Sequence, residues 1–359
     1  MLTGNKGEWS EIYALLKVIS DKQLYHGDGN LNQLENAVLP VIKVLREKSD
    51  GTYEYEIQQN IVVVSGSEKA FKIPISDFKL QAEHLLTRIK SSSAASFAIP
   101  EIEEFIALFN CKSLKAKSGV KSDIHIVLHD AATGTSPVLG FSIKSQLGNA
   151  STLLNAGKTT NFIYKLEGKK LPSQLINEIN LIDTRTKIKD RLVALTNFGS
   201  ALSFIRTENS IFSNNLTLID SALPKILAEI IYLFYTSANN TLASLVDEIS
   251  VKNPLNFDTS EKHPFYTYKV KRFLTDIALG MMPSKVWTGE LEATGGYLVV
   301  KDDGEILAYH VYNRNDFEDY LMNNTKLDTA SSTRHHFGLI YEENDDLFFK
   351  LNLQIRFVK

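Results

Sequence analysis

Three polar residues occupy alternate positions in the stretch GFSIKSQLG at 140–148, namely Ser142, Lys144 and Gln146. Side chains on a β-strand alternate between two faces, so these three share one face. The segment IHIVLHDAATGTSPVLGFSIKS contains two β-rich runs around a Gly- and Thr-bearing turn, which predicts a β-hairpin. With the turn centred near Thr133, the hairpin brings Asp123 opposite the neighbourhood of Lys144, within a residue or so.

A carboxylate and a lysine at the rim of one sheet suit metal-assisted hydrolysis of a phosphodiester. Asp123 can anchor Mg²⁺, which activates water, and Lys144 can steady the attacking water or the phosphoryl charge. The alternative is an acid–lysine pair on the surface with no chemical role. The preceding stretch KSLKAKSGVKSD suits a polyanionic substrate, although its lysines also fit a solvated loop: Lys112, Lys115, Lys117 and Lys121.

The hairpin lacks a second acid two residues before the lysine. Ser142 stands there, and a neutral hydroxyl is a weak Mg²⁺ ligand because hard cations prefer carboxylate and carbonyl oxygens. Asp123 could act with the Ile143 carbonyl and water, or an acid could come from elsewhere. GNKGEWSE offers Glu8 and Glu11, three apart on one helix face. We favour Glu8; the alternative is that both glutamates only stabilise a helix N-terminus.

The stretch FFKLNLQIRF near the end predicts one strand with a polar face that has no acid. That face carries Lys350, Asn352, Gln354 and Arg356. Such side chains can read base edges or clamp phosphates, whereas the alternative is the solvated face of an edge hairpin. Just upstream, TASSTRHHFG supplies hydroxyl, arginine and histidine side chains that suit phosphate and base contacts: Ser332, Thr333, Arg334, His335 and His336.

Bulk properties indicate an ordinary globular protein. The chain has 359 residues, 43% hydrophobic and 23% charged, which favours two or three lobes. A net charge of −3 argues against a protein that coats nucleic acid everywhere, but it allows a local basic cleft. The single cysteine, Cys111, excludes a disulfide within the chain. A polar, acidic start and the lack of any long apolar run favour a cytoplasmic protein without a membrane segment.

The elements that must position these residues form an α/β protein. We expect the first ~50 residues to be helical, with a kink or break at Pro40, a strand or hairpin at 52–64 and a hairpin around the site. The expected fold is a mixed β-sheet core flanked by helices. We divide it into a nuclease core with N-terminal helices (1–170), a mainly helical region (171–283) and a β-rich DNA-recognition lobe (284–359).

The chain resembles the HpaII-type restriction endonucleases. The resemblance rests on NKGEWSEIYALLKVI near the start and on SDIHIVLHD with GFSIKSQLGNASTLLNA in the middle. It extends to GGYLVVKDDGEILAYHVYNRNDFEDYLMNNTKL, TRHHFGLIY and FFKLNLQIRF near the end, so the blocks span nearly the whole chain. The middle block is similar to a variant of the broad PD-(D/E)xK nuclease motif, and the terminal blocks make the likeness specific.

This resemblance implies that the mixed β-sheet core is of the restriction-endonuclease type. It also implies a type II restriction enzyme that needs Mg²⁺ and cuts double-stranded DNA at a short palindrome, CCGG for the namesake, leaving 5′-phosphates. Asp123 would then bind metal, Lys144 would be the catalytic lysine, and Gln146 would match a glutamine sometimes found two residues later. Arg356 and Lys350 would read guanine, with Asn352 and Gln354 as cytosine or phosphate partners. Two departures, Ser122 for a proline and Ser142 for an acid, put the metal shell in question.

A palindromic target also implies a homodimer on DNA and a cognate DNA methyltransferase that protects the same sites. Two alternatives stay open. One is a repair or recombination nuclease on the same fold, which would act on ends or branched DNA. The other is a sequence-specific DNA-binding protein whose nuclease core is inactive.

Overall fold

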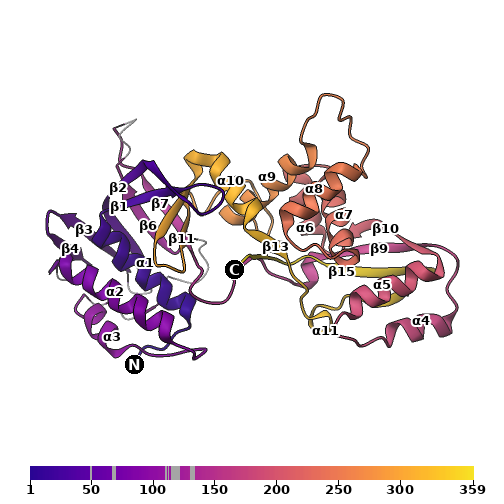
Figure 1. The fold of residues 1–359 in the computed structure, drawn as a ribbon, viewed down its shortest axis with the longest axis horizontal. Helices are drawn as coiled ribbons and strands as arrows, with labels where there is room; N and C mark the ends of the chain where they lie inside the picture. Colours follow the sequence, from indigo (N-terminus) through magenta and orange to yellow (C-terminus); the bar gives the residue numbers. More distant parts are fainter. Residues whose placement is uncertain (49–50, 67–69, 110, 112, 115–121, 130–133) are drawn as a thin grey trace.

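The molecule is elongated and consists of two lobes (Figure 1). The computed structural model describes residues 1–48, 51–66, 70–109, 111, 113–114, 122–129 and 134–359. The first lobe contains residues 1–148 together with strands β11 and β12; the second contains most of the remaining chain. Within the described residues, no helix is long and apolar enough to cross a membrane.

A nine-stranded sheet forms the first lobe, in the order β1-β12-β11-β7-β6-β2-β3-β4-β5. Strand β1 also pairs with β2, so six of these strands close into a ring. The sheet mixes parallel and antiparallel neighbours, because β7 runs parallel to β11 and antiparallel to β6. Its strands are β1 (Gln23–Gly27), β2 (Gln33–Lys48), β3 (Gly51–Gln58), β4 (Ile61–Ser65), β5 (Ala70–Pro74), β6 (Ile124–Leu128), β7 (Val138–Ser145), β11 (Gly296–Val300) and β12 (Ile306–His310).

Three helices cover this sheet: α1 (Lys6–Asp21), α2 (Ile75–Ser91) and α3 (Pro100–Ala107). The apolar spacing in EWSEIYALLKVI predicts α1, and its residues Ile12, Leu15 and Ile19 are fully buried. Helix α1 packs against both α2 and the site strand β7 (Figure 1). Trp9 stacks on Phe97 and anchors the start of α1.

The expectation of helix throughout the first ~50 residues is wrong beyond Asp21. Residues 33–48 form the long strand β2, which pairs with β1, β3 and β6. A bulge between Val41 and Lys43 shifts the register, so the buried side chains are not strictly alternate and imitate a helical period. Pro40 lies within this strand rather than breaking a helix.

Strands β11 and β12 belong to the hydrophobic cores of both lobes. Alternate residues pack into the core of the first lobe: Leu298, Val300, Ile306 and Ala308. The residues between them pack into the core of the second lobe: Tyr297, Val299, Leu307 and Tyr309. This alternation follows from strand geometry. The two lobes therefore share a wall of two strands.

The second lobe combines two small sheets with helices. A four-stranded sheet has the order β10-β9-β15-β14, and a three-stranded sheet has the order β13-β16-β8. Their strands are β8 (Thr152–Leu154), β9 (Asn161–Gly168), β10 (Ser200–Thr207), β13 (Thr325–Leu327), β14 (Ile340–Glu343), β15 (Asp346–Asn352) and β16 (Ile355–Phe357). The helices are α4 (Ser173–Asn180), α5 (Lys187–Phe198), α6 (Ser210–Ile219), α7 (Leu223–Thr236), α8 (Leu242–Lys252), α9 (Phe265–Leu279), α10 (Arg314–Asn323) and α11 (Ser332–His335).

The mixed α/β class is confirmed, and the region 171–283 is mainly helical with β10 inserted. The segment 284–359 does not stay together: β11 and β12 join the sheet of the first lobe, and β13 to β16 join the second. The division at residues 170 and 283 stays a prediction about independent folding units.

Candidate active site

The hairpin of β6 and β7 brings the predicted acid to the site strand. Ile124 pairs with Phe141, so Asp123 is level with Ser142 rather than Lys144. The offset is two positions from the register expected from the sequence. Asp123 lies at the start of β6, where its side chain is half-buried.

The Asp123 carboxylate is held through one of its oxygens. Oδ2 accepts a hydrogen bond from the backbone N–H of Ile143 at 2.7 Å and from the hydroxyl of Ser142 at 3.1 Å. Within the described part of the chain, Oδ1 accepts no hydrogen bond. Ser142 thus acts as a donor that orients the carboxylate, and Oδ1 is available for a ligand.

Lys144 follows on the same face as Ser142. Its Nζ lies 4.8 Å from the ring centre of the buried Tyr297 on β11, a cation–π contact. Burial lowers the pKa of the Lys144 ammonium, and the negative charges of Asp123 and then Glu11 oppose this shift. Asp123 and Glu11 are therefore both close enough to Lys144 to act on its charge.

Glu8 caps the helix in which it lies. Its carboxylate accepts from the backbone N–H of Asn5 at 2.8 Å, and the Asn5 side chain accepts from the N–H of Glu8 at 3.0 Å. This reciprocal pair is a capping box at the start of α1. The geometry matches the alternative interpretation of this residue, in which it stabilises the helix N-terminus.

Glu11 lies one turn further along, where α1 meets the site strand. The hydroxyl of Ser10 contacts that of Ser145 at 2.8 Å, which fixes α1 against β7 beside Lys144. Glu11 Oε2 lies 4.0 Å from the guanidinium of Arg46, and the Glu11 side chain is 20% exposed. The sequence spacing placed both glutamates on one helix face, but only the tertiary contact between α1 and β7 distinguishes them.

Two spaces flank the end of β7. A cavity of about 780 Å³ on the α1 side is lined by Glu11 and Ile143. A much smaller one on the opposite side is lined by Lys144 and Gln146. Both reach Ser145 and Gly148, so they adjoin where the strand ends. Glu11, Lys144 and Gln146 therefore surround the end of β7, and Asp123 lies on the neighbouring strand, level with Ser142.

The predicted basic loop falls outside the described residues: Lys112, Lys115, Lys117 and Lys121. Within the residues that are described, no cluster of three His, Cys, Asp or Glu side chains could hold a metal ion. Asp123 and Glu11 are only two acids, so a cation here would need carbonyl oxygen or water as well.

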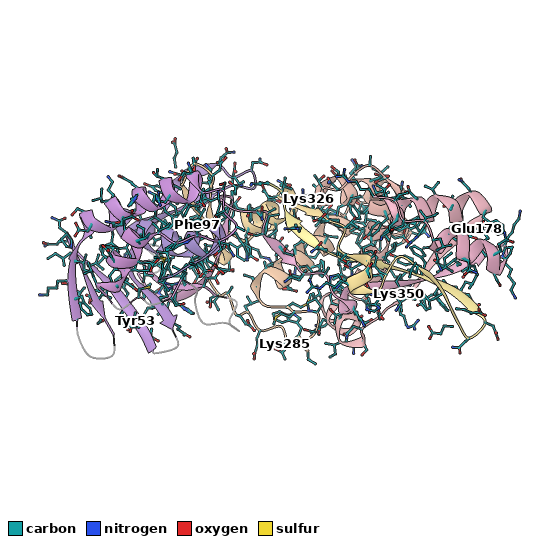
Figure 2. All side chains as sticks on the ribbon, turned by 90° about the horizontal axis from the view of Figure 1, so that it is seen from below. Tyr53, Phe97, Glu178, Lys285, Lys326 and Lys350 are labelled. Atoms are coloured by element: carbon teal, nitrogen blue, oxygen red, sulfur yellow. The ribbon has the colours of Figure 1, made fainter. Side chains whose placement is uncertain are left out.

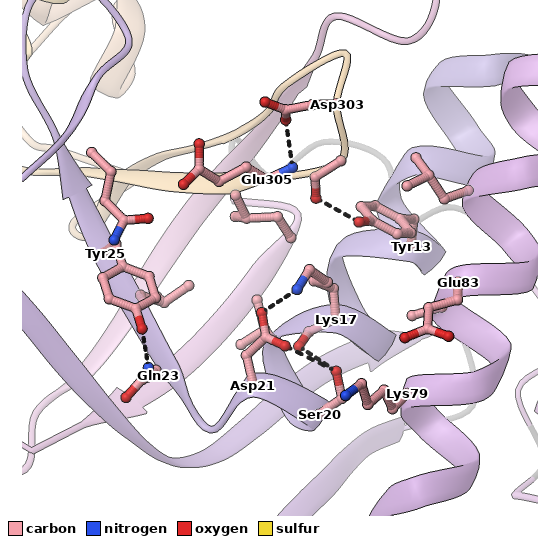
Figure 3. Close-up of a pocket in the computed structure, with 17 residues that line it drawn as sticks. Tyr13, Lys17, Ser20, Asp21, Gln23, Tyr25, Lys79, Glu83, Asp303 and Glu305 are labelled. Carbon is pink, nitrogen blue, oxygen red and sulfur yellow. Dashed lines mark hydrogen bonds and ion pairs between the residues drawn. The ribbon is translucent and has the colours of Figure 1, made fainter.

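Another cavity, of about 600 Å³, lies between α1, α2 and the β11–β12 turn (Figure 3). Three of its four acids already have cationic partners: Lys17 binds Asp21 at 2.5 Å, and Lys301 binds Asp303 at 3.3 Å and Glu305 at 2.5 Å. Tyr13 donates to the Gly304 carbonyl and closes one wall. This cavity contains none of the predicted site residues.

The predicted recognition residues at 332–336 form the short helix α11. Ser331 caps it by accepting from the N–H of Arg334 at 3.3 Å. Arg334 and His336 are exposed, whereas Ser332 and His335 are half-buried. Partial burial, and then the charges of Arg334 and His336, lower the pKa of His335.

The continuous strand expected for FFKLNLQIRF is wrong. Strand β15 ends at Asn352 in the four-stranded sheet, and β16 begins at Ile355 in the three-stranded sheet. The chain changes sheets because Leu353 is fully buried and its N–H donates to the Thr160 carbonyl at 3.0 Å. The polar residues of this stretch therefore do not form one row.

Three of those four side chains already have partners. Lys350 binds Glu208 at 2.7 Å, and Figure 2 places Lys350 on the second lobe, well apart from Phe97 on the first. Asn352 is 2% exposed and donates to Gly157 O, Thr160 Oγ1 and Asn161 Oδ1 at 2.7–3.1 Å.

Arg356 binds Asp328 at 3.3 Å and the Ala150 carbonyl at 2.9 Å. The side chain of the fourth residue, Gln354, is half-buried. Lys350, Asn352 and Arg356 thus take part in contacts within the fold.

Comparison with known proteins covers almost the whole chain. The model of the HpaII restriction endonuclease family matches residues 5–357. The type II restriction enzyme HpaII of Haemophilus parainfluenzae is 50% identical over 360 residues, which is 99% of this chain and 99% of that enzyme. No solved structure matches the chain.

Proposed function

The chain belongs to the HpaII restriction endonuclease family and is a type II restriction endonuclease; from this premise we propose that it cuts double-stranded DNA at the palindrome CCGG. The proposed reaction is Mg²⁺-dependent hydrolysis of a phosphodiester that leaves 5′-phosphates and 3′-hydroxyls. The observation that carries the proposal is the Asp123 carboxylate, fixed by Ser142 and the Ile143 N–H beside Lys144.

The oxygen donors at the end of β7 fit Mg²⁺. Asp123 has one oxygen that no described residue occupies, Glu11 lines the adjoining cavity, and the Ile143 carbonyl belongs to the strand between them. Carboxylate and carbonyl oxygens are the ligands that hard cations prefer. When bound, Mg²⁺ supplies Lewis-acid stabilisation of phosphoryl charge and a more acidic water. We assign the second acid to Glu11 instead of Glu8, because Glu8 is engaged in the capping box.

The remaining roles in the proposed reaction fall to side chains of the protein. Lys144 presents a positive charge to the phosphoryl group and to the attacking water. Tyr297 covers one side of the Lys144 ammonium through the cation–π contact. Ser142 orients Asp123 through its hydroxyl, and Gln146 extends the polar face beyond the lysine toward the substrate.

The proposed core is of the restriction-endonuclease type, with DNA bound across both lobes. Contacts to bases and phosphates come from the surface around α11, whose Arg334 and His336 are exposed, with Ser332, Thr333 and His335 beside them. A palindromic target implies a homodimer on DNA, in which each subunit cuts one strand. A DNA methyltransferase of the same specificity protects host sites.

The test is digestion of a closed plasmid with Mg²⁺ and with EDTA, by the wild type and by Lys144→Ala, followed by sequencing of the ends. The expected result is a discrete set of fragments with CCGG ends, only for the wild type with Mg²⁺. Absence of cutting in all four reactions, with DNA still bound at specific sites, would identify an inactive DNA-binding protein instead. Cutting confined to ends or branches would identify a repair nuclease.

A further inference from the structure

A cavity of about 390 Å³ in the second lobe lies apart from the end of β7. It is formed by the start of α5, the end of α7 and the segment that leads into α11. Three cationic side chains line it, and no acid does: Arg185, Lys187 and Lys189. The composition of the walls therefore favours an anion.

The three cations differ in how they are held. Lys187 binds Asp183 at 2.8 Å, and Lys189 Nζ donates to the Ser237 carbonyl at 2.7 Å, so both are positioned by local contacts. Arg185 is exposed, and in the part of the chain that the structure describes it has no ion-pair partner. Arg185 is thus the cation most able to turn toward a ligand.

Neutral donors complete the lining. Ser331 and Thr333 bring hydroxyl groups, whereas the Thr186 hydroxyl already donates to the Asp190 carboxylate at 3.1 Å. Residues 186–189 are the N-cap and first turn of the twelve-residue helix α5, and the first N–H groups of a helix are not used within it. The Lys187 N–H already donates to the Thr184 carbonyl at 3.3 Å, which leaves the N–H groups of Ile188 and Lys189. These N–H groups and the helix dipole together attract phosphate oxygens.

An independent feature of the cavity wall is the hydroxyl of Tyr235. The residue is 1% exposed, and its hydroxyl has no hydrogen-bond partner at normal geometry among the described residues, although Thr329 lies near enough to influence its pKa. A buried hydroxyl without a partner costs about 1–3 kcal/mol. A ligand oxygen in the cavity would relieve that cost.

We propose that this cavity binds one backbone phosphate of the DNA duplex, with Arg185, the start of α5 and the Tyr235 hydroxyl as its donors. The proposal rests on the proposed function, since it supplies the contact that orients DNA on the second lobe. A phosphate contact fixes register without reading sequence. The site therefore contributes affinity equally to all sequences.

The test compares Arg185→Ala and Tyr235→Phe with the wild type for binding of a CCGG duplex and an unrelated duplex, in EDTA to prevent cleavage. Arg88→Ala is the matched control, because Arg88 is exposed on α2 and no described residue forms an ion pair with it. We expect Arg185→Ala to weaken both duplexes equally, by about five- to tenfold at 0.1 M salt, and to reduce the salt slope by about 1.

Tyr235→Phe keeps the ring, so it should leave the melting temperature unchanged or higher while weakening both duplexes by about threefold. A loss confined to the CCGG duplex would make Arg185 a base reader and overturn the proposal. So would unchanged binding by both variants while the wild type binds DNA normally.

Failure of the wild type to bind either duplex would instead overturn the proposed function. A melting-temperature rise with millimolar inorganic phosphate that Arg185→Ala abolishes, with DNA binding unaffected, would show a site for free phosphate and not for DNA.

Discussion

Replacing Glu11 by glutamine tests the assignment of the second acid. The substitution keeps the size and hydrogen-bonding capacity of the side chain and removes its charge. Glu11 lies 4.0 Å from Arg46, so part of any effect could come from stability alone. Arg46 also donates to the carbonyls of Ser113 and Leu114. These contacts remain in the variant, and we expect it to fold with a loss of about 1 kcal/mol.

The expected catalytic loss is much larger. The Glu11 side chain is 20% exposed, so an effective dielectric constant of about 20 is appropriate to its surroundings. A carboxylate that holds the cation directly contributes about 4 kcal/mol in such surroundings. Allowing for solvent, kcat/KM should fall by about 100- to 1,000-fold, which corresponds to about 2.7–4 kcal/mol.

Glu8→Gln is the matched control. Glutamine also completes a capping box, so this variant should lose less than about 0.5 kcal/mol of stability and keep full cleavage. The assay is plasmid cleavage over a series of Mg²⁺ concentrations, together with the melting temperature and duplex binding in EDTA. Glu11→Gln should need more Mg²⁺ for half-maximal cutting and bind DNA normally in EDTA.

Two results would refute the assignment. Equal cleavage by the Glu11 and Glu8 variants would show that neither acid serves the site. If Glu11→Gln loses cleavage activity only as far as its melting temperature falls, with no change in the Mg²⁺ requirement, then Glu11 serves the fold as a partner of Arg46 and does not serve the site. Loss in Glu8→Gln alone would restore the preference drawn from the sequence.

Three further outcomes are expected. Ser142→Ala removes a charge-assisted hydrogen bond to Asp123, so kcat should fall about tenfold while stability is kept. Ser142→Asp should not restore activity, because it places like charges together. A more active aspartate variant would contradict this. Asn352→Ala should lower the free energy of unfolding by about 2–3 kcal/mol in a denaturant titration and leave the cut sequence unchanged; altered specificity would make it a base reader. Burial, and then Glu318, raise the pKa of Asp276 to about 6, so the wild type loses stability as the pH rises from about 4 through 6. After allowance for partial exposure, Asp276→Asn should be about 1–2 kcal/mol more stable than the wild type at pH 8. Equal stability of the two proteins at pH 8 would refute this prediction.

Local patterns predicted the elements that position the site. The hairpin of β6 and β7 follows from alternation and a turn, and α1 follows from apolar spacing. The pairing offset of Asp123 could not be predicted, because the turn length alone leaves the register open by a residue or two. The bulge in β2 misled the periodicity in the same way, since one inserted residue changes which side chains are buried.

The partners of the site depended on tertiary contacts that no local pattern contains. Glu8 and Glu11 share a helix face, and only the Ser10–Ser145 contact shows which one faces the site strand. Tyr297 is distant in sequence from Lys144 and reaches it because β11 runs parallel to β7.

Asn352 shows that a local pattern can also predict the wrong orientation of a side chain. Its alternation with apolar neighbours predicted an outward side chain, but a four-stranded sheet packed against the next segment buries it.

The sharing of β11 and β12 between the two cores also sets when the strand that carries Lys144 is completed during synthesis. Strand β7, with Lys144, is made long before β11, its neighbour on one side. Until β11 emerges from the ribosome, β7 has an unpaired edge and Lys144 lacks the ring of Tyr297. A nascent or truncated chain therefore has an incomplete strand β7. Under the proposed function, we expect cutting to begin only after β11 has been made, late in the chain, and a host that must protect its own DNA gains from this order.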